Sequence, residues 1–114
     1  LERIIEMCKR EKLLLVEDSC EATGARYSGI QVGNFGVMGS FSFYFAHHMT
    51  TIEGGMITTN DENTADLLKS ARSHGWVRDS LREDFYRGQG ENTTFLFDIL
   101  GYNLRSTDLN DSRA

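Results

Sequence analysis

No run of apolar residues in this sequence is long enough to cross a bilayer, so the sequence predicts no membrane anchor. Basic residues are also few, with 12 against 17 acidic residues and a formal net charge of −5, and they are scattered along the chain. This pattern argues against a nucleic-acid partner. Only two cysteines occur, Cys8 and Cys20, without a CxxC or Cys/His spacing, so buried free thiols are favoured over a disulfide.

An initiating methionine is absent as well, and so is a positively charged leader followed by a short apolar stretch. Without such a leader, the cytoplasm is the default expectation. The 114 residues suffice for one small domain with a core, and their 39% hydrophobic and 25% charged composition is typical of a soluble protein. Because the sequence enters an amphipathic pattern directly at Leu1, it is expected to be an excerpt of a longer protein.

Apolar spacing then indicates the first elements. Residues 2–11 carry an apolar stripe at helical spacing with charges opposite, which predicts a helix. Residues 13–16 form a continuous apolar run, which is typical of a strand in a parallel sheet covered on both faces. The run ends at Glu17 and Asp18. Since ligands of open α/β sheets gather outside the carboxyl ends of the strands, these acids lie where a site is expected.

The middle of the sequence alternates between strand and loop patterns. Residues 19–24 are expected to start a short helix, and the glycine-rich residues 27–39 are expected to form a loop. Residues 40–45 alternate hydroxyl and aromatic side chains, which predicts a strand. A second β-rich run follows at residues 56–59.

The last third is less regular. Asn60 or Asp61 is expected to cap a helix that runs toward His74 and Gly75. Residues 76–94, which are rich in charge and glycine, are expected to form an exposed excursion or an interface loop.

Residues 42–55 (SFYFAHHMTTIEGG) carry the strongest motif. They resemble the cofactor-anchoring segment of the sugar aminotransferases of the DegT/DnrJ/EryC1/StrS family, which depend on pyridoxal phosphate (PLP). Counted from Ser42, the sixth residue of that segment is a lysine that anchors the cofactor, and here it is His47. Imidazole has no primary amine for this linkage, but it carries protons near neutral pH. The usual proline is also replaced, by Phe45.

The resemblance implies a fold and a boundary. It implies an α/β fragment of the large domain of a fold-type I, aspartate aminotransferase-like enzyme, with a mixed, mostly parallel sheet and flanking helices. Residues 1–114 would be a partial cofactor-binding domain that lacks the N-terminal phosphate loop and the small C-terminal domain. A homodimer is the expected assembly. Residues 110–114 depart from the helical continuation of the family at this point.

The same resemblance assigns cofactor contacts residue by residue. Asp18 matches the aspartate that pairs with the pyridine nitrogen, and Ser42 matches the serine that binds the phosphate. Glu21 lies where many relatives place glutamine or histidine near the ring hydroxyl, and its role is open. Asn103, in a Gly-Tyr-Asn element, matches an asparagine that reaches the neighbouring subunit's phosphate. Three of these residues also have a plain structural interpretation: Asp18 as an acid at a strand end, Ser42 as a solvated serine and Asn103 as a turn asparagine.

The string that begins with His47 and His48 resembles one subgroup, the nucleotide-sugar 3-dehydratases of lipopolysaccharide and deoxysugar biosynthesis. These enzymes use pyridoxamine phosphate (PMP), which needs no lysine linkage. The resemblance implies that His47 takes a proton from the cofactor methylene carbon and that the hydroxyl at C3 of a nucleotide-linked 4-keto-6-deoxy sugar leaves as water. Glutamate would be the amino donor. An iron–sulfur cluster is disfavoured, because residues 76–97 contain no cysteine.

Alternatives remain beside this hypothesis. A metal site at the two adjacent histidines is disfavoured, because neighbours on an extended chain point to opposite sides and no third ligand has a suitable spacing. A non-catalytic or regulatory cofactor-binding relative keeps the fold without the activity. An ordinary nucleotide-sugar aminotransferase would need one of three lysines outside the anchoring register: Lys9, Lys12 or Lys69.

Overall fold

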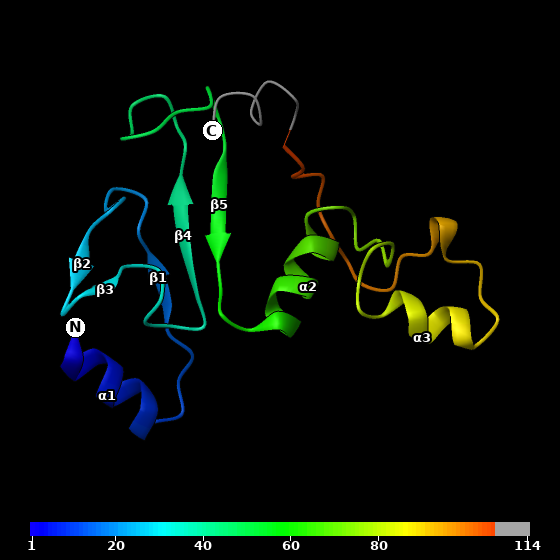
Figure 1. Cartoon of the computed structure of the whole chain (residues 1–114), viewed down its shortest axis with the longest axis horizontal. Helices are drawn as coiled ribbons and strands as arrows, with labels where there is room; N and C mark the ends of the chain where they lie inside the picture. Colours follow the sequence, from blue (N-terminus) through cyan, green and yellow to red (C-terminus); the bar gives the residue numbers. More distant parts are fainter. Residues whose placement is uncertain (107–114) are drawn as a thin grey trace. The chain divides into compact units, whose positions relative to one another are not determined.

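The computed structural model describes residues 1–106, which fall into two compact units (Figure 1). Unit 1 comprises Leu1–Asn60 with Ser106, and unit 2 comprises Asp61–Arg105. The departure expected at residues 110–114 lies outside the described residues. No helix of the described part has the length and apolar character that a membrane span requires.

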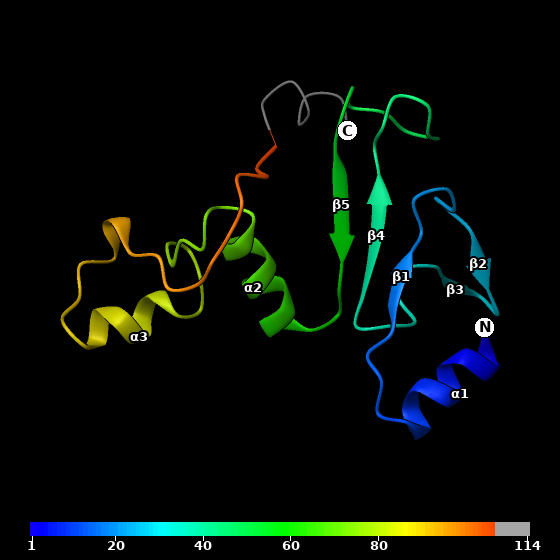
Figure 2. The ribbon, with the colours of Figure 1, turned by 180° about the vertical axis from the view of Figure 1, so that it is seen from behind.

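Unit 1 is built on a three-stranded mixed sheet. The strands are β1 (Val16–Asp18), β4 (Met38–Ser42) and β5 (Gly55–Thr58), and β4 lies between the other two, as both ribbon views show (Figures 1 and 2). β1 runs parallel to β4, and β5 runs antiparallel to it. Alternate residues of β4, Gly39 and Phe41, are buried, as the period of two in a strand requires.

The first strand differs from its prediction. The apolar run at residues 13–16 leads into β1 rather than forming it, and the prediction of burial on both faces is wrong for this part of the chain. Leu14 is 79% exposed and Val16 is 55% exposed. A continuous apolar run is buried only where other polypeptide covers the sheet, and residues 1–106 supply no such cover at these two side chains.

The glycine-rich segment also holds more structure than a loop. Strands β2 (Arg26–Tyr27) and β3 (Ile30–Gln31) form a small antiparallel hairpin. Ser28 and Gly29 both have positive φ angles, of 49° and 81°, which is the geometry of a two-residue turn of type I′. Residues 19–24 form turns rather than the expected short helix, since only one-turn contacts such as Ala22 N–H to Ser19 O close there.

The carboxylate of Glu17 holds this segment against β1. It accepts backbone N–H groups from Gly33 at 2.7 Å, from Phe35 at 2.6 Å and from Gly36 at 2.8 Å. These three hydrogen bonds satisfy backbone N–H groups that would otherwise have no partner when water is excluded. Of the two acids that end the apolar run, Glu17 is therefore structural, and Asp18 is left for the edge of the sheet.

The two longer helices match the sequence patterns. α1 (Glu2–Arg10) buries Cys8 and places Glu2 in its first turn and Lys9 and Arg10 in its last turn, where these charges favour the helix dipole. α2 (Glu62–Ala71) begins at Asp61, whose side chain accepts the N–H of Thr64 at 2.7 Å. Of the two cap candidates, the structure selects Asp61.

The Asp61 cap gives a test with a defined sign. Hydrogen bonds from Thr64 lower the pKa of Asp61 in the folded protein. The stability that Asp61 contributes is therefore fully present at pH values above the ordinary pKa of a carboxyl group. It is lost as the pH falls through the lower pKa of the folded state. We expect Asp61→Ala to lower the melting temperature of unit 2 by a few degrees at neutral pH. Asp61→Asn keeps an acceptor and is expected to melt as the wild type does. Circular dichroism melts between pH 7 and pH 2 measure both, and equal losses in the two variants would contradict this role.

Unit 2 contains two elements within the stretch expected to be an excursion. They are α3 (Glu83–Gly88) and the short 3₁₀ helix η1 (Thr93–Phe95). Glu83 is buried and accepts hydrogen bonds from Asp79 N–H at 2.8 Å, from Arg87 at 2.7 Å and from Thr93 Oγ1 at 3.0 Å. Chiefly because of the Asp79 N–H, the pKa of Glu83 is lowered. A charged segment becomes ordered here because one buried carboxylate collects its donors.

Candidate active site

The carboxyl ends of two parallel strands form the candidate site in unit 1. Asp18 ends β1 and Ser42 ends β4, and the register places Asp18 beside Ser40. Because the strands are parallel, both ends lie at the same edge of the sheet (Figure 2). The structure therefore brings the two predicted cofactor contacts to one edge.

His47 lies in a loop whose base is tied together. Phe43 N–H donates to Gly54 O at 2.8 Å, and Thr51 N–H donates back to Phe43 O at 3.1 Å. The Thr51 side chain is buried and donates to Glu53 O at 3.0 Å. These bonds continue the β4–β5 pairing beyond the strands. They fix the two ends of the histidine loop at the edge where Ser42 lies.

The His47 side chain is 20% exposed and faces Glu21, with its Nε2 3.6 Å from Glu21 Oε1. The backbone N–H of His47 donates to Tyr44 O at 2.9 Å and closes a turn, and the Tyr44 ring meets the imidazole edge-on at a centroid distance of 5.6 Å. Nδ1 is buried and has no hydrogen-bond partner within residues 1–106. The ring is thus held by Tyr44, while one buried nitrogen is left for a group from outside the described residues.

A cavity of about 440 Å³ lies beside this ring and is lined by Glu21, Ala46, His47 and His48. The strand predicted to reach Phe45 stops at Ser42, and residues 45–49 form turns and bends. Adjacent histidines consequently line one cavity, so the extended-chain argument against a metal does not apply here. Within residues 1–106, no group of three or more metal-ligating side chains is present.

Asp18 is held as a carboxylate by its local turn. Its Oδ1 accepts the backbone N–H of Cys20 at 3.2 Å. Hydrogen bonds from Cys20 lower the pKa of Asp18, and the charge of His47 acts in the same direction. An anion at the end of a parallel strand is the form required to stabilise a protonated ring nitrogen.

Cys20 is a neighbour that the sequence reasoning treated only as a buried thiol. It is half-buried and free, and its Sγ lies 3.9 Å from Ser40 Oγ. The hydrogen bond to Asp18 raises the pKa of the Cys20 thiol, so at neutral pH it is an uncharged donor. The Asp-x-Cys spacing was the available signal, since an aspartate often accepts the N–H two residues later.

The two remaining predicted contacts differ in placement. Ser42 Oγ accepts the N–H of Tyr44 at 3.2 Å, which leaves its own proton to donate. Asn103 belongs to unit 2, where it forms an isolated antiparallel bridge with Ser73. The role of Asn103 across a dimer interface stays a prediction.

Comparison with known proteins shows that this chain is similar to enzymes that act on nucleotide-linked sugars. It is 36% identical over 110 residues to the GDP-4-keto-6-deoxy-D-mannose 3-dehydratase of Yersinia pseudotuberculosis, covering 93% of this chain and 28% of that protein. It is also 36% identical over 109 residues to the GDP-perosamine synthase of Caulobacter vibrioides, covering 96% of this chain and 26% of that protein. The chain thus spans little more than a quarter of the length of these relatives.

A solved relative agrees in fold. The structure of the E. coli GDP-4-keto-6-deoxy-D-mannose 3-dehydratase with bound hydrated PLP matches with a TM-score of 0.80 at 32% identity, over 96% of this chain and 29% of that one. The expected α/β fold, part of an aspartate aminotransferase-like large domain, is confirmed. The sequence pattern of one family extends over residues 1–112, and the chain belongs to that family, the DegT/DnrJ/EryC1/StrS aminotransferases.

Proposed function

We propose that this chain is part of a nucleotide-sugar 3-dehydratase that uses PLP in its pyridoxamine form. The observation that carries the proposal is His47 at the cofactor-lysine position, held at the carboxyl edge of a β1–β4 pair that also presents Asp18. The relatives of the chain include a GDP-linked 4-keto sugar 3-dehydratase and a GDP-perosamine synthase, and these names support a nucleotide-linked substrate. Residues 1–114 would be one portion of the large domain of a homodimeric, cytoplasmic enzyme.

The side chains at this edge fit the cofactor. Asp18 offers an anion for the ring nitrogen, and Ser42 offers a free hydroxyl proton for the phosphate. Nδ1 of His47 is buried without a partner among the described residues, and such an atom gains free energy when a bound polar group pairs with it. Two strand ends and the loop after β4 thus supply three groups that match an anionic, aromatic ligand with a protonated ring.

Each residue then has one task. Asp18 holds the pyridine nitrogen in its protonated form, and Ser42 anchors the phosphate. When bound, the cofactor supplies the electron sink that allows the bond between sugar C3 and its oxygen to break. Nε2 of His47, as the neutral base, accepts the proton from the cofactor methylene carbon and, as the cation, donates one to the leaving hydroxyl, so that water departs.

Glu21 helps to orient this proton carrier. Its Oε1 lies 3.6 Å from Nε2 of His47, and attraction between the two side chains favours the ring orientation seen here. Its effect is modest because the Glu21 side chain is 83% exposed to water. The resemblance left the role of Glu21 open, and we propose that Glu21 positions His47.

The reaction itself is the first test. The full-length protein is mixed with PMP and GDP-4-keto-6-deoxymannose, and mass spectrometry follows loss of the C3 oxygen. We expect product lighter by one oxygen, and glutamate is expected to regenerate the amine form of the cofactor for further turnovers. Binding without any product would favour the non-catalytic alternative, and an amino sugar at C4 would favour the aminotransferase.

Asp18 is tested separately by cofactor retention. Asp18→Ala removes the anion opposite the ring nitrogen and is expected to weaken PMP binding about tenfold or more, because a charge-assisted hydrogen bond is lost. Absorbance of the bound cofactor after dialysis measures the loss. Glu17→Gln is unsuitable as a control because that carboxylate holds the loop, so Glu6→Gln on the exposed face of α1 serves instead. If both variants retain the same amount of PMP, Asp18 does not contact the ring nitrogen.

A further inference from the structure

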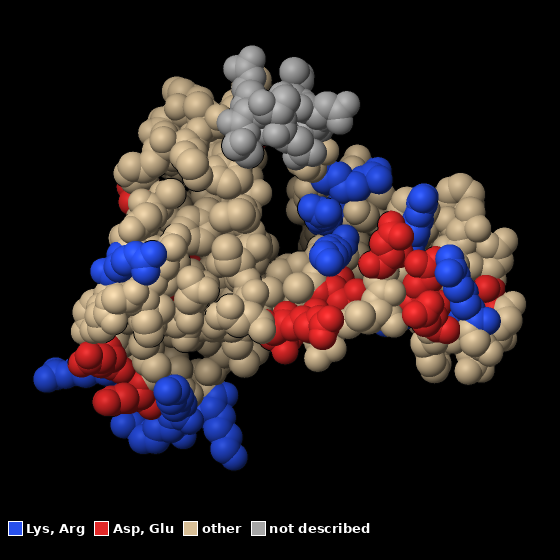
Figure 3. Space-filling model, viewed as in Figure 1, with Lys and Arg blue, Asp and Glu red and all other residues tan. Residues whose placement is uncertain are grey.

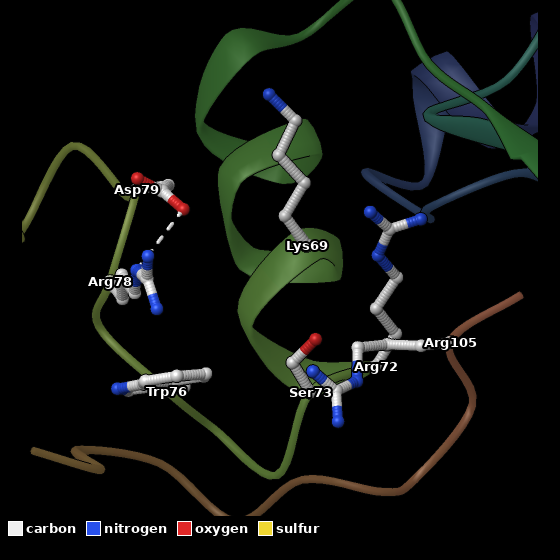
Figure 4. A pocket seen from close by; sticks show the side chains of 7 residues that line it. All are labelled: Lys69, Arg72, Ser73, Trp76, Arg78, Asp79 and Arg105. Atoms are coloured by element: carbon white, nitrogen blue, oxygen red, sulfur yellow. Dashed lines mark ion pairs between the residues drawn. The ribbon is translucent and has the colours of Figure 1, made fainter. Parts of the chain in front are cut away.

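Unit 2 contains a second cavity, of about 290 Å³, whose lining is dominated by cations. It is lined by seven residues: Lys69, Arg72, Ser73, Trp76, Arg78, Asp79 and Arg105. They come from three segments, namely the last turn of α2 and the residues after it, the loop before α3, and the irregular end of the described chain (Figure 4). No task in the proposed mechanism uses this cavity.

The charge here is opposite to that of the chain as a whole. The chain has a net charge of −5, yet four of its 12 basic residues line this one cavity. Blue basic side chains accordingly gather beside α2 in the space-filling view (Figure 3). The single acid, Asp79, lies 3.7 Å from Arg78 and offsets only part of this charge. Like charges drawn together in one cavity repel one another, and a bound anion relieves that repulsion.

Among the described residues, most of these cations form no ion pair. Within residues 1–106, no ion pair involves Lys69, Arg72 or Arg105, whereas Arg82 and Arg87 elsewhere in unit 2 are paired with buried carboxylates. Figure 4 shows Arg72 and Arg105 on one side of the cavity, with Arg78 above the Trp76 ring on the other. Guanidinium groups on two sides match the separated oxygens of a ligand with two linked anionic groups.

Trp76 gives the cavity an apolar wall. Its ring stacks on Phe95 at a centroid distance of 6.1 Å, and Arg78 lies over it with Cζ 5.2 Å from the ring centroid. The indole N–H is occupied by Thr94 O at 3.1 Å. The ring is thus fixed in place and holds Arg78 over the cavity. Ser73 adds a hydroxyl for a further hydrogen bond.

We propose that this cavity binds a diphosphate group. The diphosphate of a nucleotide-linked sugar is the ligand that its chemistry fits best, and this assignment of the source rests on the proposed function. The phosphate oxygens would be shared among Arg72, Arg78 and Arg105, with Lys69 supplying further charge. A free diphosphate acting as an effector has the same chemistry, so the test separates the two sources.

The test measures binding of inorganic pyrophosphate and of GDP to the full-length protein by isothermal titration calorimetry at low salt. The double variant Arg72→Gln/Arg105→Gln is expected to bind both about tenfold more weakly, because two charge-assisted contacts are lost. A higher salt concentration should reduce the difference in affinity between the wild type and the double variant, because salt screens the charges. Lys9→Gln removes an exposed cation on α1 of the other unit and is expected to bind like the wild type. Guanosine, which has no phosphate, should bind all three proteins equally.

Unchanged pyrophosphate affinity in the double variant would overturn the proposal. Hydrogen exchange over residues 61–105 shows whether that variant is still folded, and Arg78→Gln provides a second variant on the opposite wall if it is not. Pyrophosphate that competes with the sugar substrate identifies the substrate's own diphosphate, and binding without competition identifies a free effector. Because binding is measured without turnover, loss of binding in the variants supports the site even if no dehydration occurs, and dehydration with unchanged binding rejects it.

Discussion

His47→Gln is expected to reduce the rate of sugar dehydration by about 10²- to 10⁴-fold while the cofactor stays bound, because one positioned group carries both proton transfers. Glutamine retains hydrogen-bonding atoms and comparable size, but it neither accepts nor donates a proton at neutral pH. The rate is measured on full-length protein preloaded with PMP, by the loss of the C3 oxygen in single-turnover mass spectrometry. Cofactor absorbance in the same sample separates lost chemistry from lost binding.

His48→Gln is the matched control for that variant. His48 is exposed, lines the same cavity and follows directly in the chain, but the Glu21 contact and the Tyr44 packing belong to His47. We expect His48→Gln to slow the reaction less than about tenfold. A reversed order, with His48 the more damaging site, would make His48 the proton carrier and would require a loop conformation in which it replaces His47 beside Glu21.

The local elements were largely readable from the sequence. The helix at residues 2–11, the strand at 56–59 and the capped helix after Asp61 all follow from patterns within the elements themselves. The motif beginning at Ser42 was likewise sufficient to predict the family, because its register survives the loss of the lysine. The prediction that was wrong depended on contacts with other parts of the molecule. Residues 13–16 predict a covered strand, but burial depends on what packs against the strand, and residues 1–106 leave Leu14 and Val16 exposed.

The candidate sites, too, could be predicted only in part from the sequence. That Asp18 and Ser42 share an edge follows from parallel pairing, which the apolar run already suggested. The partners of His47 did not follow, because Glu21 reaches it from a turn where a helix was expected. The basic cavity could not be predicted from the sequence. Lys69 and Arg105 are distant in sequence, and scattered cations form a site only once the chain has folded.

Gly75→Ala is expected to destabilise unit 2 strongly, through backbone strain and steric overlap at one position. Gly75 has a φ of 85°, which disfavours a Cβ, and an added Cβ would overlap the carbonyl group of Ile99. The backbone cannot easily retreat, since Gly75 N–H donates to Ser70 O at 2.9 Å and Gly75 O accepts Asp98 N–H at 3.1 Å. Strain and overlap together are expected to cost about 3 kcal/mol or more.

Gly90→Ala isolates the first of these two costs. Gly90 has nearly the same φ, 82°, but an added Cβ would meet no atom within 4 Å. Its expected cost is therefore only the backbone term, about 1–2 kcal/mol. Hydrogen exchange of the full-length protein, followed by mass spectrometry over residues 71–103, measures the local opening free energy in both variants. If the two alanines cost the same, the close approach of Gly75 to Ile99 contributes nothing, and the crossing between the end of α2 and the segment before Asn103 is looser than the structure shows.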